Sequence, residues 1–398
     1  MSGELESAFL RLDSVLSDSH QLWLPRPFTT DDLPWSHTHP DLKTALLALS
    51  DTAVTQLHNS PQQRLDWFRE REPALCAALC AFAPGPTTTI RAPAFDHFDS
   101  LHIPGRKWQQ VLAFAGALGQ HEYPHVDWCA GKGHLSRIVQ RNLQQPVHCI
   151  EWDASLVGIG RALAQQRGCD IHYHQQDVMQ ALPAACADAD TVHIGLHACG
   201  ELHQQLLRHV ASSGARALVM SPCCYHKVSS EHYVPLSRTA QLSRLRLDRP
   251  ALHLAVQDTV TARRGERPLR ELERWWRLAF DALQRDLRDT DAYLHVPSCK
   301  RELLRAGFPE FCRWAAGCKQ LELPATIDYA YYLQRGREKH RAIVRLELLR
   351  QLFNRPLELW LALDYALYLE QHGYRVHVTQ FCDRSVSPRN VLIQGQRD

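Results

Sequence analysis

Two glycines that follow an acidic residue form a pattern that could bind a cofactor. The segment Asp127-Trp-Cys-Ala130-Gly131-Lys-Gly133-His comes after a short apolar run and opens a helical pattern. Glycines let the backbone turn tightly and approach a ligand, and the first amides of the helix point into the same space. Glu151 lies 20 residues beyond Gly131, at the end of the next apolar run, where a carboxylate can bind ribose hydroxyls.

The acidic residues indicate which cofactor this turn accepts. A dinucleotide site usually has a third glycine three positions after the second, where this chain has Ser136. Asp127 would repel a pyrophosphate but suits the ammonium and sulfonium groups of S-adenosylmethionine (SAM). Asp177, after the third apolar run, can accept a hydrogen bond from the adenine amino group. The pattern therefore favours a class I SAM-dependent methyltransferase over a NAD-type dehydrogenase, and over unrelated acids at strand ends.

A second group of reactive side chains follows two later apolar runs. One run ends in Gly-Leu-His-Ala-Cys-Gly and the next in Ser-Pro-Cys-Cys-Tyr-His. Neighbouring parallel strands bring their carboxyl ends to one edge of the sheet, so we expect this group beside the transferable methyl group. Its members are His197, Cys199, Cys223, Cys224, Tyr225 and His226.

Several roles are open to this group. The histidines or Tyr225 could remove a proton from the acceptor as a general base. Cys223 or Cys199 could instead add to a cytosine ring before methyl transfer. A C-x-H spacing without a second C-x-x-C is poor for structural zinc, so no metal is expected, and packing alone is the alternative for Cys199 and Cys224. The predicted catalytic residues are His197, Cys223, Tyr225 and His226, and His197 is also assigned to the cofactor site.

Alternating strands and helices are expected to position both groups. Five short apolar runs are separated by helical patterns long enough for crossover connections, which predicts a parallel, Rossmann-like α/β sheet. A buried helix over 357–371 and strands over 374–381 and 391–394 are expected to complete the same sheet. The first five strands are predicted at 125–129, 146–151, 171–174, 191–197 and 217–221.

The sequence predicts four segments. Residues 1–100 form a helical N-terminal region, and residues 101–226 form the first part of the methyltransferase domain. Residues 227–352 form a helical insertion between the fifth and sixth strands, and residues 353–398 return to the sheet. The insertion has about 24 Lys and Arg against about 16 Asp and Glu, whereas the whole chain has 45 against 43.

Basic residues suggest how a substrate binds. The excess in the insertion suits RNA phosphates, and interleaved aromatic side chains suit exposed bases. Arg106 and Lys107, before the first strand, could bind an anion or form a solvated helix face. Arg389, in the last hairpin, could clamp a phosphate or carboxylate, or simply belong to a turn. The aromatic residues are Trp275, Trp276, Trp314, Tyr329, Tyr331 and Tyr332.

Composition places the chain among soluble globular proteins. Of its 398 residues, 45% are hydrophobic and 22% are charged, which excludes disordered and coiled-coil classes. The acidic N-terminus lacks the features of a signal peptide, and no apolar run could span a bilayer. Thirteen cysteines, an odd number, favour reduced thiols over a disulfide framework. We therefore expect a cytoplasmic protein without membrane contact.

Four motifs resemble a known group of methyltransferases. The strings RKWQQ, CAGKGH, LHACG and PCCYH are similar to the methyltransferase domain shared by the glutathione S-transferase C-terminal-domain-containing protein and the methyltransferase-like 25 proteins. The closing SPRN also matches, and the resemblance covers 103–225 and 357–394. The eukaryotic tRNA 2′-O-methyltransferase of the acceptor stem is similar too, but has His where this chain has Tyr225. This second resemblance implies an RNA substrate, and we expect tRNA or rRNA.

The sequence therefore leaves three functional hypotheses open. The leading hypothesis is SAM-dependent methylation of RNA. The alternatives are a protein or small-molecule methyltransferase, and a SAM-binding scaffold without catalytic activity.

Overall fold

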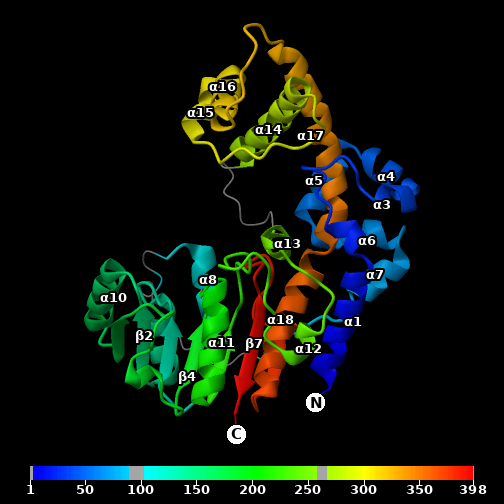
Figure 1. Ribbon diagram of the computed structural model, residues 1–398. Helices are drawn as coiled ribbons and strands as arrows, with labels where there is room; N and C mark the ends of the chain where they lie inside the picture. Colours follow the sequence, from blue (N-terminus) through cyan, green and yellow to red (C-terminus); the bar gives the residue numbers. More distant parts are fainter. Residues whose placement is uncertain (1–2, 89–99, 101–102, 197, 258–266, 398) are drawn as a thin grey trace. The chain divides into compact units, whose positions relative to one another are not determined.

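The computed structural model describes residues 3–88, 100, 103–196, 198–257 and 267–397. The chain forms two compact units (Figure 1). The first comprises Met1–Ser17, Ala77–Asp258 and Asn354–Asp398, and the second comprises Asp18–Cys76 and Thr259–Phe353. Each unit is therefore assembled from segments that are far apart in the sequence.

A seven-stranded sheet in the order β3-β2-β1-β4-β5-β7-β6 forms the core of the first unit. Strands β1 to β5 pair in parallel, and β7 runs antiparallel to both β5 and β6. Every residue of the central strands β1, β4 and β5 is buried, as expected for a parallel sheet covered on both faces. The predicted Rossmann-like sheet, including its C-terminal hairpin, is confirmed. The strands are β1 (His125–Trp128), β2 (Val147–Glu151), β3 (Ile171–Gln175), β4 (Val192–Gly195), β5 (Ala217–Met220), β6 (Arg375–Gln380) and β7 (Val391–Gln396).

Helices cover the sheet and lead the chain back to each parallel strand. α8 (Gly105–Gly116) packs on α9 (His134–Leu143), and α9 and α10 (Ala154–Gln166) pack on β2 and β3. α11 (Glu201–Ser213) packs on α18 (Asn354–Gln371), which lies along β6 and β7 (Figure 1). A short 3-10 helix, η1 (Ala184–Cys186), precedes β4.

Residues 227–257 pack into the sheet unit, although they belong to the segment predicted as a separate insertion. Asp364 of α18 explains this, because its buried carboxylate accepts hydrogen bonds from Tyr233 Oη at 2.6 Å and from the amides of Leu236 and Ser237 at 2.9 and 2.7 Å. The N-terminal helix joins the same unit, with Phe9 against Trp360. The helices concerned are α1 (Glu4–Asp18), α12 (Arg238–Gln241) and α13 (Arg249–Ala255).

The second unit is helical. Of the six aromatic residues expected to stack on bases, Trp276 is buried in the core of this unit, four pack against that core, and Tyr331 is 51% exposed.

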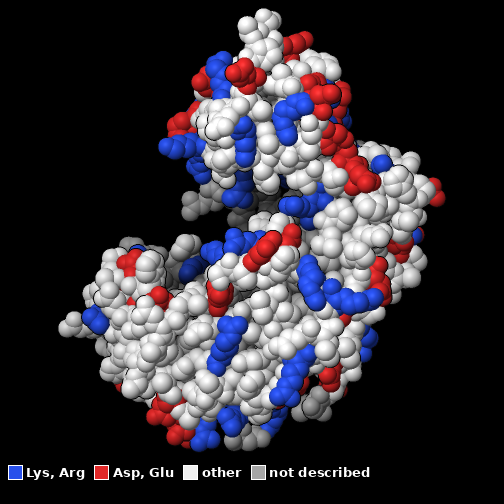
Figure 2. All heavy atoms as spheres, in the orientation of Figure 1, with Lys and Arg blue, Asp and Glu red and all other residues white. Residues whose placement is uncertain are grey.

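Basic and acidic side chains are intermixed on the face of this unit shown in Figure 2. In the part of the chain described, no helix is both long and apolar enough to cross a membrane. The helices are α2 (His20–Trp23), α3 (Trp35–Thr38), α4 (Pro40–Leu47), α5 (Asp51–Asn59), α6 (Pro61–Arg69), α14 (Arg267–Arg288), α15 (Arg301–Ala306), α16 (Phe308–Cys318) and α17 (Tyr329–Leu352). The boundary between the two units falls within α7 (Pro73–Leu79).

Candidate active site

The glycine turn after β1 has the tight backbone geometry that its sequence predicts. Gly131 and Gly133 have φ angles of +57° and +65°, and Gly133 lies at the start of α9. A Cβ atom on Gly133 would come within 2.0 Å of the Tyr173 hydroxyl. Both the backbone conformation and the adjacent β3 side chain therefore require glycine at this position.

Asp127 is a buried acid at this turn, and its pKa is raised. Its side chain is 3% exposed, and Ser136 Oγ donates a hydrogen bond to Asp127 Oδ2 at 2.6 Å. Burial raises the pKa of Asp127 to about 7, although the hydrogen bond from Ser136 and the positive charge of Lys107 act in the opposite direction. Asp127 is therefore about half ionised at neutral pH, and a cationic partner beside it would favour the carboxylate form.

Glu151 links the end of β2 to the glycine turn. Its Oε2 atom accepts a hydrogen bond from the Gly131 amide at 2.9 Å, and Oε1 accepts one from the Asp153 amide at 3.1 Å. Since Glu151 is 5% exposed and bonded through both oxygens, its position beside the turn is fixed.

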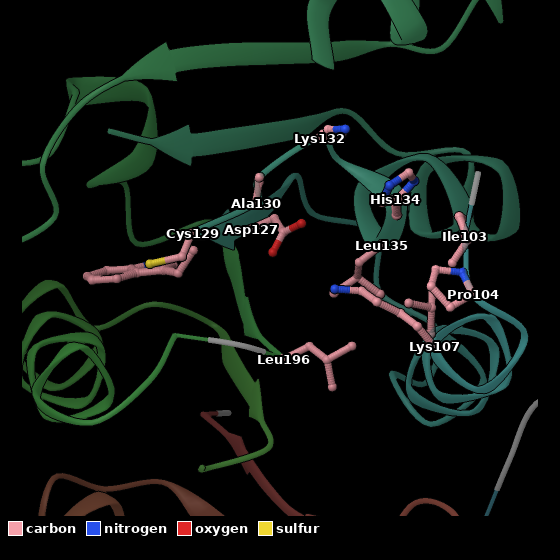
Figure 3. A pocket seen from close by; sticks show the side chains of 13 residues that line it. Ile103, Pro104, Lys107, Asp127, Cys129, Ala130, Lys132, His134, Leu135 and Leu196 are labelled. Atoms are coloured by element: carbon pink, nitrogen blue, oxygen red, sulfur yellow. The ribbon is translucent and has the colours of Figure 1, made fainter. Parts of the chain in front are cut away.

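Two adjacent cavities lie at this edge of the sheet and share Cys129. A cavity of about 300 Å³ is lined by Asp127, Ala130 and Gly131. Figure 3 shows Asp127 and Lys107 reaching into it. A second cavity of about 210 Å³ includes two of the predicted acids in its lining, Glu151 and Asp177. Five predicted cofactor residues thus line these two cavities, namely Asp127, Ala130, Gly131, Glu151 and Asp177, whereas Gly133 lines neither.

Sequence reasoning missed several lining residues. Lys132 and His134 line the first cavity, next to the glycines that drew attention. Trp152, which follows Glu151 and is 75% exposed, lines the second. Lys107, predicted as a substrate residue, lines the cofactor cavity instead. Their proximity in sequence to Gly133 and Glu151 was the available signal.

His197, predicted for both catalysis and cofactor binding, lies outside the described residues. The cysteines near it in sequence converge: the Sγ atoms of Cys199 and Cys223 are 2.9 Å apart, and Cys224 Sγ lies within 4.8 Å of both. Hydrogen bonds with Cys199 and Cys223 lower the pKa of the Cys224 thiol. The two strand-end loops therefore meet, as predicted from the parallel sheet.

Tyr225 and His226 line neither cavity in the described part of the chain. Tyr225 is 1% exposed, its ring packs against Tyr365, and burial raises the pKa of its hydroxyl well above the ordinary value. His226 stacks edge-on with His253, and its buried Nδ1 has no hydrogen-bond partner among the described residues. This placement favours packing for Tyr225, and the catalytic roles of both residues stay predictions.

The two other basic residues predicted to bind substrate differ in their surroundings. Arg106 is exposed on α8. The Arg389 guanidinium donates hydrogen bonds to the carbonyls of Ala255 and Val256 and lies 3.6 Å from Glu358 Oε1. Arg389 therefore ties the β6–β7 loop to α13 and α18, and these contacts occupy the group expected to clamp an anion.

Residues 106–231 match the model of a methyltransferase domain family. No curated protein matches the chain. Solved structures similar to part of it include magnesium protoporphyrin IX methyltransferase from Synechocystis PCC 6803 with bound SAM, at 20% identity over 32% of this chain and 64% of that chain, with a TM-score of 0.25. An RNA methyltransferase from Salinibacter ruber aligns at 16% identity over 34% of this chain and 86% of that one, with a TM-score of 0.26.

Geranyl diphosphate C-methyltransferase from Streptomyces coelicolor A3(2) aligns at 15% identity, over 35% of this chain and 57% of that chain, with a TM-score of 0.27. The chain spans less than two thirds of the length of the Synechocystis and Streptomyces proteins. Residues 106–231 therefore carry a methyltransferase domain, and the sheet order and the acidic glycine turn agree with the class I fold.

Proposed function

We propose that this protein is a SAM-dependent methyltransferase that modifies RNA. One observation supports a polyanionic substrate: a run of exposed basic side chains follows directly after the loop at the end of β5, in the same unit as the two cavities. It has only two acids, Glu231 and Asp248, within 227–257. Figure 2 shows basic side chains over the drawn face of this unit. The basic residues are Lys227, Arg238, Arg244, Arg246 and Arg249.

The cavities suggest which residues hold each part of SAM. Asp127 would pair with the ammonium group, and Lys107, in the same cavity, with the carboxylate of the methionine portion. Glu151 would exchange its backbone partners for the ribose hydroxyls, and Asp177 would accept a hydrogen bond from the adenine amino group. Bound SAM supplies an electrophilic methyl group on a sulfonium.

The acceptor side is less fully assigned. An RNA hydroxyl or amine needs a base to take its proton as the methyl group arrives. His197 and His226 follow β4 and β5 in sequence and are the candidates for that base, whereas Cys223 would be needed only for attack on a pyrimidine ring. A transfer that depends on the histidines but not on Cys223 would indicate a hydroxyl or amine acceptor.

Labelled SAM incubated with fractionated cell extract tests the substrate. We expect label in RNA, lost after ribonuclease treatment and retained after protease treatment. Replacing both Arg244 and Arg246 by Glu should reduce RNA methylation at least tenfold and flatten its dependence on salt, while SAM affinity by calorimetry stays unchanged. Replacing Arg313 and Arg335 of the second unit by Glu provides the matched charge control. Label in polypeptide or metabolite, with none in RNA, would reject the proposal.

A further inference from the structure

Three cysteine sulfurs form a compact cluster at the carboxyl ends of β4 and β5. Cys199 Sγ and Cys223 Sγ are 2.9 Å apart, and the sulfur atoms of Cys199, Cys223 and Cys224 all lie within 4.8 Å of one another. Cys223 is buried, while Cys199 and Cys224 are half-buried. Such a group of thiols has the donor atoms that soft metal ions prefer.

The backbone holds the two loops together without help from the sulfurs. The Gly200 amide donates to the Cys223 carbonyl at 3.2 Å, and the Glu201 amide donates to the Lys227 carbonyl at 2.9 Å. Gly200 has a φ of +66°, and a Cβ atom there would come within 2.2 Å of the Lys227 carbonyl oxygen. Glycine at position 200 therefore permits the close approach that brings the cysteines together.

We propose that Cys199, Cys223 and Cys224 bind one Zn²⁺ ion through three thiolates, with the fourth position left to water or another ligand. Zn–S bonds of about 2.3 Å in a tetrahedron place sulfurs about 3.8 Å apart, inside the 4.8 Å limit observed. The Cys199–Cys223 pair would open by about 1 Å to reach that spacing. On binding, three S–H groups release their protons to solvent and three Zn–S bonds form, without any change of oxidation state.

The surroundings can support the negative charge of three thiolates around one dication. α11 begins at Glu201, two residues after Cys199, so the positive end of a 13-residue helix lies next to this ligand in the chain. Lys227 adds a positive side chain to the same pair of loops. Among the described residues, no other His, Cys, Asp or Glu side chain places a ligand atom within 4.8 Å of all three sulfurs. This leaves the open coordination position that catalytic zinc sites have.

The cluster also borders the cofactor site. Leu196 and Leu202 flank Cys199 in sequence, and they line the first and the second cavity, respectively. The sequence pattern predicted no metal, because C-x-H and C-C spacings are unlike those of zinc fingers. A site assembled from two strand ends needs no such spacing, since the parallel sheet provides the proximity.

A second group, His148, His174 and Cys186, also lies within 4.8 Å. Its two histidines already share a hydrogen bond, with His148 Nδ1 3.1 Å from His174 Nε2, and it offers only one sulfur. This group is the natural comparison, because a variant of Cys186 removes a buried thiol without touching the proposed ligands.

The test uses the full chain, purified without chelator or reducing agent and analysed for zinc by mass spectrometry. We expect one zinc per chain, retained in Cys186→Ser and Cys318→Ser and lost in Cys223→Ser and in the Cys199→Ser/Cys224→Ser double variant. Circular dichroism and SAM calorimetry on each sample separate loss of metal from loss of fold or of the proposed cofactor site. Cobalt titration of chelator-treated wild type provides a second measurement that does not depend on the folding of a serine variant, and strong thiolate-to-cobalt absorption is expected.

Three results would overturn the proposal. One is wild-type protein that binds neither zinc nor cobalt while its thiols titrate as free. Another is an intact mass and peptide map that show a disulfide between Cys199 and Cys223 in place of metal. The third is zinc that stays in folded Cys223→Ser but disappears from Cys186→Ser, which would locate the metal at the histidine pair.

Discussion

Replacing Asp127 by Asn is expected to stabilise the fold while it weakens SAM binding. Asp127 is buried, and burial raises the pKa of its carboxyl from an ordinary 3.8 to about 7. Asn keeps the shape of the side chain and an oxygen that can accept the hydrogen bond from Ser136. The variant therefore removes the cost of a buried negative charge without opening a cavity.

The magnitude and its pH dependence follow from the pKa. A carboxyl whose pKa is higher in the folded than in the unfolded state favours folding when protonated, and that advantage is lost as pH rises from about 4 to about 7. A difference of about three pH units corresponds to about 4 kcal/mol. The stability gained by Asp127→Asn should therefore be near zero at pH 4, grow through pH 5 and 6, and level off above pH 7.

Urea denaturation of both proteins at a series of pH values measures this difference, with calorimetry for SAM at pH 8. SAM affinity should fall at least tenfold because the ammonium loses its charged partner. Asp177→Asn is the control, since Asp177 is exposed and should leave stability unchanged. An Asn variant that is less stable at pH 8, or whose stability difference does not vary with pH, would refute the electrostatic argument.

Three further variants test the site and the fold. Gly133→Ala should lower the free energy of unfolding, measured by urea denaturation, by about 1–3 kcal/mol, because alanine would have to adopt a positive φ and its Cβ would clash with Tyr173 Oη. Adding Tyr173→Phe should restore part of that stability. A single variant as stable as the wild type would contradict this. Asp364→Ala should cost about 3 kcal/mol or more, because three buried donors lose their acceptor; a loss below 1 kcal/mol would mean that these hydrogen bonds contribute little. Lys107→Met should weaken SAM binding about tenfold by calorimetry, whereas Arg106→Met on the exposed face of α8 should not; equal effects would exclude a specific contact.

Local patterns in the sequence predicted most of the sheet and the edge where the cofactor residues lie. The central parallel strands β1, β4 and β5 are short apolar runs buried on both faces, so their places in the sequence are visible without tertiary information. The turn at Gly131 and Gly133 and the acid at the end of β2 lie close in space because β1 and β2 are neighbours. The proximity of Asp127 and Glu151 followed from that topology alone.

The roles of side chains whose contacts come from distant parts of the sequence could not be predicted from local patterns. Arg389 looked like a free cation in a loop, but its partners come from α13 and α18. Tyr225 stands next to reactive residues in sequence, yet its ring is buried against Tyr365 of α18. The carbonyl partners of Arg389 and the ring partner of Tyr225 lie more than one hundred residues away in the sequence, so spacing along the chain gave no signal.

The N-terminal helices illustrate the same limit at the scale of a whole unit. They were expected to form a region of their own, whereas most of them pack with the basic helices of α14 to α17. Polar contacts join the two segments: His58 Nε2 lies 2.9 Å from the Val344 carbonyl, and Arg350 donates to the Trp23 carbonyl at 2.8 Å. Part of the basic side chains of α17 therefore stabilise this helical unit and are not available to a substrate, so the charge excess in the sequence overstates the surface open to RNA. For this reason the test of RNA binding uses the exposed arginines of the sheet unit, Arg244 and Arg246.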